Sequence, residues 1–264
     1  MSIIQTVILA VIEGITEFLP ISSTGHLIIG TSVMGIAEQE FTKFFIVSIQ
    51  FGAIFSVVVL YWRRFVQSWS FYLKLLAGFL PAVVLGKLFG SQIDALLENV
   101  IVVAISLLGG GVILLFVDNW FRKTEEKGET AVSFPAAFKI GLFQTIAMIP
   151  GVSRAAATII GGLAQKLTRQ TAAEFSFFLA VPTMLAATVY KLQQFHQNGN
   201  GLGGREMGLL VIGNVVAFVV AMLAIKSFIA YLSRHGFRAF GIYRIVVGCV
   251  LLLLHFFGVE LSSL

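Results

Sequence analysis

Long apolar stretches dominate this chain, and polar positions are few within them. Six of these stretches run without a break for about 20 residues. That is the length an α-helix needs to cross the hydrocarbon core of a bilayer. The pattern therefore predicts six membrane-spanning helices, at about 44–62, 71–90, 98–118, 174–192, 207–229 and 240–258.

Two further apolar stretches, about 1–35 and 136–165, are interrupted by Pro20 and Pro150 beside small and hydroxyl residues. Proline removes a backbone donor and disfavours helix at the residue before it, so each stretch is predicted to form two half-helices. Neither half is long enough to cross a membrane alone. We interpret both stretches as re-entrant helix pairs whose broken backbone is buried in protein or faces water.

The two broken stretches resemble each other, with a serine three residues after the proline and an offset of 130 residues in a chain of 264. Three predicted spans follow each stretch, and because three is odd, the second half is expected to be inverted. We predict an all-α polytopic membrane protein with a single integral membrane domain, 1–264, built from inverted repeats of about 1–130 and 131–264. Paired broken helices in such repeats mark a site near the membrane midplane.

Composition supports this class of protein. Hydrophobic residues make up 58% of the chain, charged residues 12%, and the mean hydropathy is +0.94. Soluble domains carry about a quarter charged residues, so soluble, disordered, collagen-like and disulfide-scaffold classes are excluded. A single cysteine, Cys249, excludes a disulfide framework and a cysteine metal site. The N-terminus has no basic region before its apolar residues, so no signal peptide is predicted.

The net charge of +5 reflects orientation in the bilayer. No basic run alternates with aromatic residues, so we expect no nucleic-acid partner. Thirteen Lys and Arg residues, Arg244 among them, fall on one predicted face. The other face has four: Lys43, Lys87, Lys191 and Arg205. The excess places the first face in the cytoplasm and both termini outside.

Two acidic residues interrupt the first half-helix, where charge facing lipid is costly. Glu13 and Glu17 lie four positions apart, hence on one helix face. Their repulsion must be offset by a shared proton, a cation or a basic partner. A hard divalent cation suits carboxylate oxygens, and Mg²⁺ is commonly held by one or two carboxylates plus substrate phosphate. The pair is therefore a candidate metal site, with a solvated helix start as the alternative.

Hydroxyl residues and a histidine follow the first proline directly. Ser22, Ser23 and Thr24 stand where a helix N-cap is expected, and the free N–H groups of a helix start attract anions. His26 follows Ser23 by three residues, near enough to a serine hydroxyl or a phosphate to act as base, acid or donor. This stretch is therefore a candidate for nucleophilic and acid–base chemistry, with Ser22 and Thr24 as candidate substrate-binding residues.

The second break carries a serine and an arginine. Ser153 is predicted to cap a helix with Arg154 in its first turn, where a positive charge is unfavourable unless an anion neutralises it. The guanidinium fork fits phosphate oxygens bidentately. If the two breaks meet, they bring together two helix N-termini, two carboxylates and this arginine. Such a constellation suits a phosphate or pyrophosphate, with or without a metal.

At these residues the chain closely resembles the undecaprenyl-diphosphate phosphatases, the bacitracin-resistance-type enzymes of the bacterial inner membrane. The matching stretches are EGITEFLPISSTGH, from Glu13 to His26, and PGVSR, from Pro150 to Arg154, followed by Thr158. The resemblance extends over essentially the whole chain in size, span number and motif position.

The resemblance implies hydrolysis of the terminal phosphate of undecaprenyl diphosphate, with a divalent cation, Mg²⁺ or Ca²⁺, and a site facing the periplasm. It implies that Glu13 and Glu17 are the metal-associated acids and that Ser23 and His26 are the nucleophile and its acid–base partner. The phosphate binders it implies are Ser153, Arg154 and Thr158. Whether Ser23 or His26 attacks phosphorus, or Ser23 orients a water, stays open.

One residue departs from the family pattern, which usually has serine after the arginine, where this chain has Ala155. The departure removes one expected hydroxyl contact to phosphate. A flippase or transporter of a polyprenyl phosphate is the alternative function, because broken helices in inverted repeats are shared with secondary transporters. The run 109–111 of three glycines would permit close helix packing, which suits a homodimer as a partner arrangement.

Overall fold

The computed structural model describes residues 1–66, 68–97, 99–122, 128–197 and 202–257. Apart from one isolated bridge between Glu129 and Leu167, these described residues contain no β-structure. The helices are α1 (Ile3–Thr16), α2 (Ser23–Val33), α3 (Glu40–Leu60), α4 (Trp62–Phe65), α5 (Trp69–Leu97), α6 (Val100–Trp120), α8 (Phe134–Ile146), α9 (Arg154–Ala164), α10 (Arg169–Gln197), α11 (Gly204–His235) and α12 (Arg238–Phe256).

Six helices are long and apolar enough to cross a membrane, which confirms the six predicted spans. They are α3, the first part of α5 (Trp69–Gly90), α6, α10, α11 and α12. Helix α5 leaves helical geometry at Phe89, next to the end of its apolar part. The protein is therefore a multi-pass membrane protein, as its hydrophobic pattern predicts.

The two stretches with central prolines break, as predicted. Helices α1 and α2 have 14 and 11 residues, and α8 and α9 have 13 and 11. At 1.5 Å per residue each is at most about 21 Å long, shorter than the hydrocarbon core of about 30 Å. None of them crosses a bilayer alone. Their re-entrant path through the membrane stays a prediction.

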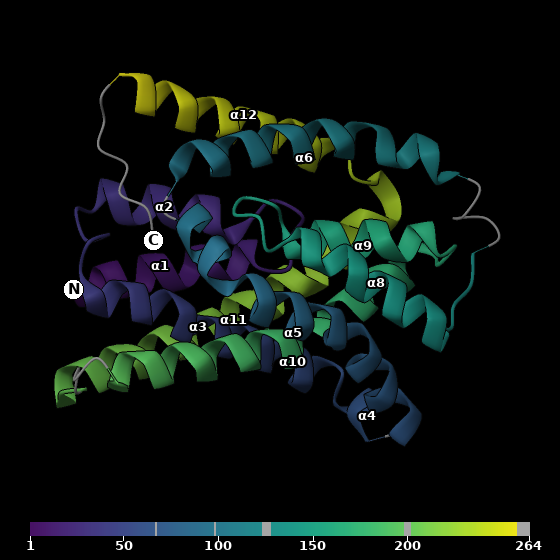
Figure 1. Ribbon diagram of the computed structural model, residues 1–264, viewed down its shortest axis with the longest axis horizontal. Helices are drawn as coiled ribbons and strands as arrows, with labels where there is room; N and C mark the ends of the chain where they lie inside the picture. Colours follow the sequence, from purple (N-terminus) through teal and green to yellow (C-terminus); the bar gives the residue numbers. More distant parts are fainter. Residues whose placement is uncertain (67, 98, 123–127, 198–201, 258–264) are drawn as a thin grey trace.

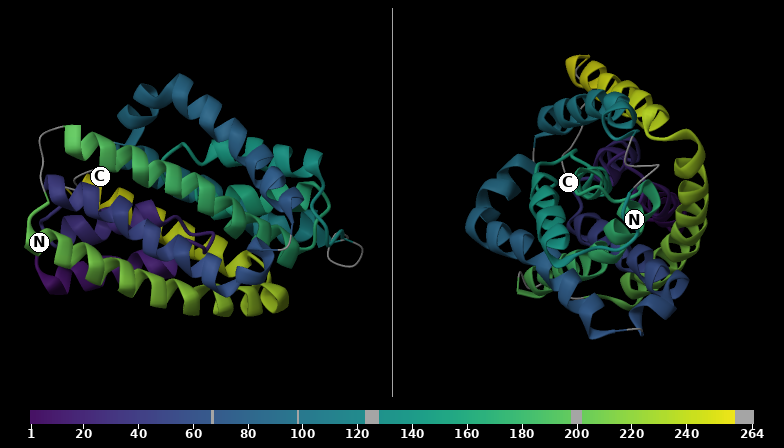
Figure 2. Two further views of the ribbon diagram at one scale, coloured as in Figure 1. Left: turned by 90° about the horizontal axis from the view of Figure 1, so that it is seen from below. Right: turned by 90° about the vertical axis from the view of Figure 1, so that its right-hand side faces the viewer.

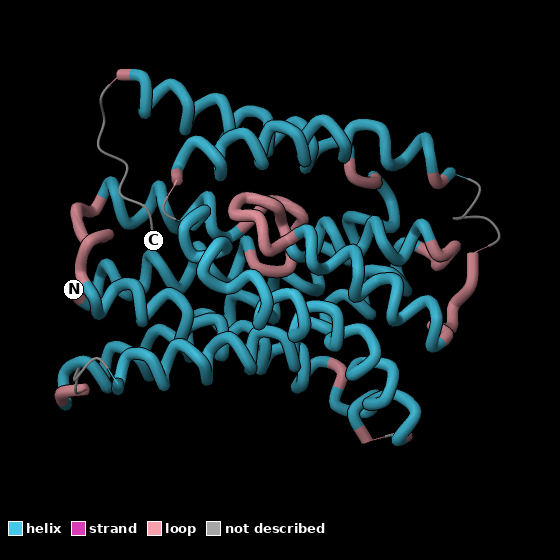
Figure 3. The backbone as a smooth tube through the Cα atoms, viewed as in Figure 1, coloured by secondary structure: helices cyan, strands magenta, loops and turns pink. Residues whose placement is uncertain are grey.

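The two breaks meet in the middle of the bundle. Figure 3 shows their loops together at the centre, whereas most other loops lie toward the two ends of the long helices. The Ser153 hydroxyl donates to the carbonyl of Leu19 at 3.4 Å, which links residues 134 positions apart. The tertiary fold thus brings both motifs to one place.

The long helices surround this centre. Helix α6 packs along α12, and α3 packs against both α10 and α11 (Figure 1). Helix α1 packs on α11, as α8 packs on α5. The end-on view in Figure 2 shows the short helices of the two breaks, in purple and teal, toward the middle of the bundle, with α5 and α11 outside them. In chain order, α1 corresponds to α8, α3 to α10, α5 to α11 and α6 to α12. Exchanging each helix for its counterpart gives contacts that are also present, as a two-fold relation would require. The inverted repeats themselves stay a prediction.

Glycines let α6 and α12 approach closely. A Cβ added to Gly111 would lie 2.9 Å from the carbonyl oxygen of Gly241, and one added to Gly241 would lie 2.8 Å from that of Gly111. Such contacts are typical of membrane helices packed through small residues. The glycine run therefore serves packing within the chain, although Gly109 faces open space. The homodimer stays a prediction.

The largest apolar core joins the two halves next to the breaks. Phe18, fully buried, follows Glu17 directly and packs edge-to-face on Phe177 of α10 with ring centroids 5.3 Å apart. Ala155 and Ile159 of α9 belong to the same core. This packing fixes the backbone on which the polar side chains of both breaks are carried.

Candidate active site

The first break places Glu17 beside Ser23. The Ser23 hydroxyl donates to Oε2 of Glu17 at 2.7 Å. Ser22, at the N-cap of α2, has φ 68° and ψ 100°, a conformation that non-glycine residues rarely adopt. Its side chain makes no capping hydrogen bond, so the expected Ser22 cap is absent from this described segment. Strain of this kind persists where the surrounding structure enforces it, commonly at functional sites.

The second break depends on a glycine and a cap. Gly151 has φ +84°, and a Cβ there would collide with the backbone of Val103 in α6, so only glycine fits this turn. Ser153 caps α9 by accepting the N–H of Ala156 at 3.2 Å, and Arg154 is the first residue of the helix. The predicted cap and the predicted place of the arginine are both confirmed.

An ion pair joins the two breaks. Nη2 of Arg154 donates to Oε1 of Glu17 at 2.9 Å, and the side chains are only 12% and 7% exposed. Nη1 of Arg154 donates to the carbonyl of Ser176 in α10 at 2.9 Å. Glu17 is thus the anion that a cation at the start of α9 requires, and Arg154 is the basic partner that relieves the repulsion between the two acids.

A cavity of about 170 Å³ opens against this pair. Its walls include six residues singled out from the sequence and five others; they are Glu17, Ser22, Ser23, Thr24, Gln50, Ala147, Val152, Ser153, Arg154, Thr183 and Met184. Two buried donors nearby have no partner among the described residues, namely Nε of Arg154 and Nε2 of Gln144. Buried donors are normally satisfied, so an anionic oxygen bound against Arg154 would complete its Nε.

Glu13 lies beside this network and is fully buried. Its carboxyl interacts with that of Glu17, and neither oxygen has a hydrogen-bond partner among the described residues. A buried carboxylate without a partner is costly, so it calls for a proton or a cation. No group of three or more His, Cys, Asp or Glu side chains suited to a metal occurs in the described ranges. A hard divalent cation fits two carboxylates completed by phosphate oxygens.

His26 faces away from the serine with which it was predicted to work. Its Nδ1 lies 2.7 Å from the carbonyl oxygen of Ser22, and because a carbonyl only accepts, Nδ1 carries the proton. In the neutral ring Nε2 then accepts from the Tyr243 hydroxyl at 2.8 Å, and the two rings stack with centroids 5.5 Å apart. The predicted contact between Ser23 and His26 is not made in this structure, where Ser23 is bonded to Glu17.

Comparison with known proteins identifies the family. Residues 6–250 match the family described as bacitracin resistance protein BacA. The chain belongs to this family. The resemblance inferred from the two motifs is therefore confirmed.

Relatives from three bacteria match over nearly their whole length, and all three are named undecaprenyl-diphosphatase. One from Flavobacterium psychrophilum is 61% identical over 257 residues, covering 97% of each chain. One from Bdellovibrio bacteriovorus is 52% identical, covering 99% of each chain. One from Aquifex aeolicus is 44% identical, covering 93% of this chain and 96% of its own.

In this member of the BacA family, Thr158 lies behind Arg154 and does not line the cavity. Thr158 is fully buried, and its hydroxyl is 2.6 Å from that of Ser176 and 2.8 Å from the carbonyl oxygen of Arg154. Ser176 in turn accepts from the guanidinium of Arg154. The geometry makes Thr158 and Ser176 supports of the arginine. Direct binding of phosphate by Thr158 stays a prediction.

Ala155, where the family pattern has serine, is fully buried in the apolar core and does not line the cavity. A hydroxyl at this position would lie away from bound phosphate. We therefore expect Ala155→Ser to change kcat/KM for phosphate release by less than about twofold. Ala147→Ser, which adds a hydroxyl to the cavity wall, is the comparison that should alter the rate. A tenfold gain in Ala155→Ser would contradict the placement.

The prediction that Arg244 lies on the cytoplasmic face is wrong. Arg244 is 1% exposed, inside the bundle. Its guanidinium donates to the carbonyls of Pro20 at 3.2 Å and Gly151 at 3.0 Å, one from each break, and to those of Ser106 at 3.0 Å and Leu107 at 3.4 Å in α6. Breaks leave carbonyls without helical partners, and a buried arginine with five donors satisfies them. Arg244 therefore ties both breaks to α6.

Sequence reasoning overlooked several polar residues inside apolar spans. Gln50 and Thr183 line the cavity, and Ser176 and Gln144 bond to residues of its wall. Arg244 also falls within a predicted span, about 240–258. A polar side chain within a span was the available signal, since such residues face the protein interior.

The packing of Arg244 against α6 can be tested with two neighbouring glycines. A Cβ on Gly110 would collide with the guanidinium of Arg244, whereas one on Gly109 meets nothing within 4 Å. We expect Gly110→Ala to lower stability by roughly 1–3 kcal/mol, as overpacking does, and to reduce phosphate release. Gly109→Ala should leave both near the parent values. Thermal unfolding in detergent and phosphate release measure the two effects. Equal stability and equal activity of the two variants would show that Arg244 does not tie the breaks to α6.

Proposed function

We propose that this protein hydrolyses undecaprenyl diphosphate to undecaprenyl phosphate and inorganic phosphate. The observation that carries the proposal is the bonded series Ser23–Glu17–Arg154, which spans both breaks and lines one cavity. A nucleophilic hydroxyl, a carboxylate that accepts its proton and a guanidinium that fits phosphate are the groups such hydrolysis needs. The names of the family and of its relatives agree with this chemistry. The reaction recycles the lipid carrier of cell-wall synthesis.

The contact between Ser23 and Glu17 supplies the nucleophile. As Ser23 Oγ attacks the terminal phosphorus, its proton passes to Oε2 of Glu17, along the existing 2.7 Å hydrogen bond. The bond between the terminal phosphorus and the bridging oxygen breaks, and undecaprenyl phosphate leaves. Water then cleaves the phosphoserine, which releases inorganic phosphate and restores the hydroxyl. The acid–base role predicted for His26 requires its ring to leave Tyr243.

Positive groups around the cavity stabilise the transferring phosphoryl group. Arg154 lies in the wall as the first residue of α9, and a helix start favours an anion beside it. The unpartnered Nε of Arg154 is a further donor for phosphate oxygens. Donors held in place before the reaction stabilise developing charge without reorganising, which is the main source of catalysis in phosphoryl transfer.

Glu13 and Glu17 are the residues that would hold a divalent cation, Mg²⁺ or Ca²⁺. The support is the pair of unpartnered Glu13 oxygens next to a second carboxylate. A bound cation would neutralise charge on the diphosphate. Glu17 has Ser23 and Arg154 as partners already, so Glu13 is the acid whose charge remains to be balanced.

The protein is inferred to lie in the bacterial inner membrane, with both termini outside and its site opening to the periplasm. The N-terminal ammonium donates to Gln39, next to the start of α3, at 3.3 Å. The chain terminus and the start of α3 therefore share one end of the bundle. That end is the cation-poor one in the predicted topology, which the positive-inside rule assigns to the outside.

Phosphate release from undecaprenyl diphosphate by the purified protein in detergent tests the function. We expect release by the parent and its loss on addition of a chelator, with recovery when Mg²⁺ or Ca²⁺ is restored. Substrate that binds without release of phosphate, in the presence of either cation, would refute the proposal.

Glu13→Gln tests the cation site in the same assay. Glutamine keeps the shape and removes the charge, so we expect the Mg²⁺ concentration for half-maximal rate to rise about 10- to 100-fold. Glu206→Gln, at the distant start of α11, is the matched control, because Glu206 caps its own helix by accepting from Gly203. An unchanged Mg²⁺ dependence in Glu13→Gln would exclude Glu13 as a ligand.

A further inference from the structure

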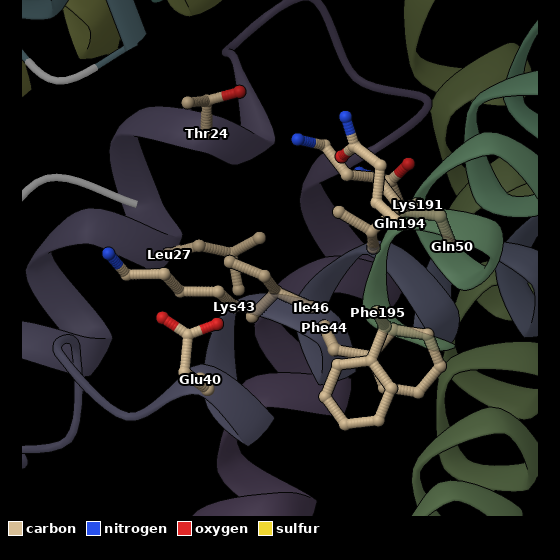
Figure 4. Close-up of a pocket in the computed structure, with 11 residues that line it drawn as sticks. Thr24, Leu27, Glu40, Lys43, Phe44, Ile46, Gln50, Lys191, Gln194 and Phe195 are labelled. Carbon is tan, nitrogen blue, oxygen red and sulfur yellow. The ribbon is translucent and has the colours of Figure 1, made fainter. Parts of the chain in front are cut away.

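A second cavity adjoins the catalytic one. It has a volume of about 320 Å³ and lies between α2, α3 and α10, as Figure 4 shows. Thr24 and Gln50 line both cavities, so the two share a wall at these residues. We refer to this second cavity, with Lys43, Lys191 and Gln194 among its lining residues, as the vestibule.

The vestibule leads from the catalytic cavity toward one end of the bundle. On α3 its lining runs from Gln50 back to Lys43 and Glu40, the first residue of the helix. Ten positions of α-helix cover about 15 Å. On α10 the lining moves from Thr183, in the catalytic cavity, to Lys191 and beyond, near the end of that helix. The vestibule thus connects a buried site with the surface.

The charge of the vestibule is unusual for its side of the membrane. The end that it reaches carries few cations, namely Lys43, Lys87, Lys191 and Arg205. Two of these four, Lys43 and Lys191, line the vestibule and are partly buried, whereas the other two are exposed. Glu40, at the mouth, is the one acidic residue in the described lining. Cations gathered where topology disfavours them indicate an anionic ligand.

The cavity that the described residues line at the opposite end of the bundle is separate from the catalytic one. A cavity of about 230 Å³ lies there, lined by residues that include Arg64, Lys74 and Glu174. It shares no described lining residue with the catalytic cavity. A small anion in the catalytic cavity therefore has its polar, positively charged path through the vestibule.

We propose that the vestibule binds inorganic phosphate as it leaves the catalytic cavity, with Lys43 and Lys191 as its charged ligands. This rests on the proposed function, in which each turnover produces one lipid and one free phosphate. The lipid product can return to the bilayer directly, whereas inorganic phosphate must reach water. Two partly buried lysines attract phosphate as point charges, and the polar Thr24 and Gln50 lie at the junction.

Phosphate inhibition of the parent and the double variant Lys43→Gln/Lys191→Gln tests this site. Phosphate in the catalytic cavity competes with substrate, whereas phosphate in the vestibule obstructs release while substrate is bound and so lowers kcat. We expect the parent to show both effects. In the double variant, the inhibition constant of phosphate for its effect on kcat should rise at least about tenfold. The inhibition constant for its competition with substrate, and KM itself, should stay within about twofold of the parent. Ionic strength is held constant, because screening alone weakens exposed charges.

Lys87→Gln is the matched control, since Lys87 is an exposed cation at the same end outside the vestibule. It should retain both inhibition constants. Purely competitive inhibition of the parent, or an unchanged kcat effect in the double variant, would overturn the proposal. A raised KM with unchanged phosphate inhibition would also overturn it, because the lysines would then serve the diphosphate headgroup of the lipid.

A binding measurement separates this site from the catalytic function. Inorganic phosphate should raise the thermal unfolding temperature of the parent relative to chloride at equal ionic strength. The rise should be smaller in the double variant and unchanged in Lys87→Gln. If no phosphate is released from substrate but these differences in unfolding temperature are found, the phosphatase proposal is refuted and the anion site stands. If phosphate raises the unfolding temperature equally in all three proteins, the anion site is refuted.

Discussion

Replacing Ser23 with alanine is expected to reduce phosphate release by at least about 10³-fold, because the variant lacks the hydroxyl that attacks phosphorus. Ser23 is the one cavity-lining hydroxyl bonded to Glu17 among the described residues. Alanine also leaves Oε2 of Glu17 without its donor. Single-turnover assays with saturating substrate measure the chemical step directly, and KM should change little, since Arg154 and the helix termini still bind the diphosphate.

Two other serines provide the controls for Ser23. Ser22 lines the same cavity and makes no capping hydrogen bond, so Ser22→Ala should lose far less activity. Ser48 in α3 donates to the carbonyl of Phe44 and lies outside the catalytic cavity, so Ser48→Ala should stay near the parent. Full activity in the double variant Ser22→Ala/Ser23→Ala would exclude a serine nucleophile.

Arg154→Lys is expected to lower kcat/KM by about 10²- to 10³-fold although it keeps the positive charge. The guanidinium reaches Glu17 and Ser176 at the same time and leaves Nε unpartnered beside the cavity. A lysine ammonium is a single point of charge and cannot hold both partners while also contacting phosphate. Steady-state phosphate release measures the loss, and the size of the change in kcat shows how much arises in the transition state.

A second, partly buried ion pair supplies the matched control for Arg154→Lys. Arg169 donates to Asp118 at 2.8 Å near one end of the bundle, with side chains 18% and 23% exposed. Arg169→Lys makes the same chemical change outside the catalytic cavity, so activity should remain within about threefold of the parent. If the two lysine variants retained equal activity, Arg154 would have no role beyond stability.

Much of the fold follows from local rules that operate on short stretches of sequence. Six apolar runs of spanning length became six long helices, and Pro20 and Pro150 ended helices where proline chemistry predicts. Ser153 caps α9 because a hydroxyl before a helix start satisfies a free N–H wherever it occurs. These features need no knowledge of which segments pack together.

Contacts between distant segments were harder to predict. Charge counting placed Arg244 at the cytoplasmic face, yet it bonds to both breaks, because free carbonyls there offered acceptors that a sequence does not display. The spacing of His26 suggested Ser23 as its partner, but the ring stacks on Tyr243 of α12 instead. Which partner a polar side chain takes depends on the helix that packs beside it.

Hydrophobic length, proline geometry and motif spacing are local properties of the chain, so the membrane class, the six spans, the two breaks and the family could all be predicted from the order of residues. The packing of distant segments is what makes Glu17 bond to both Ser23 and Arg154, keeps Thr158 and Ala155 off the cavity, and lets two cavities share Thr24 and Gln50. These are contacts and cavities between distant segments, and the ion pair alone joins residues 137 positions apart. They arise from how close-packed helices meet, and the order of residues along one helix does not specify them.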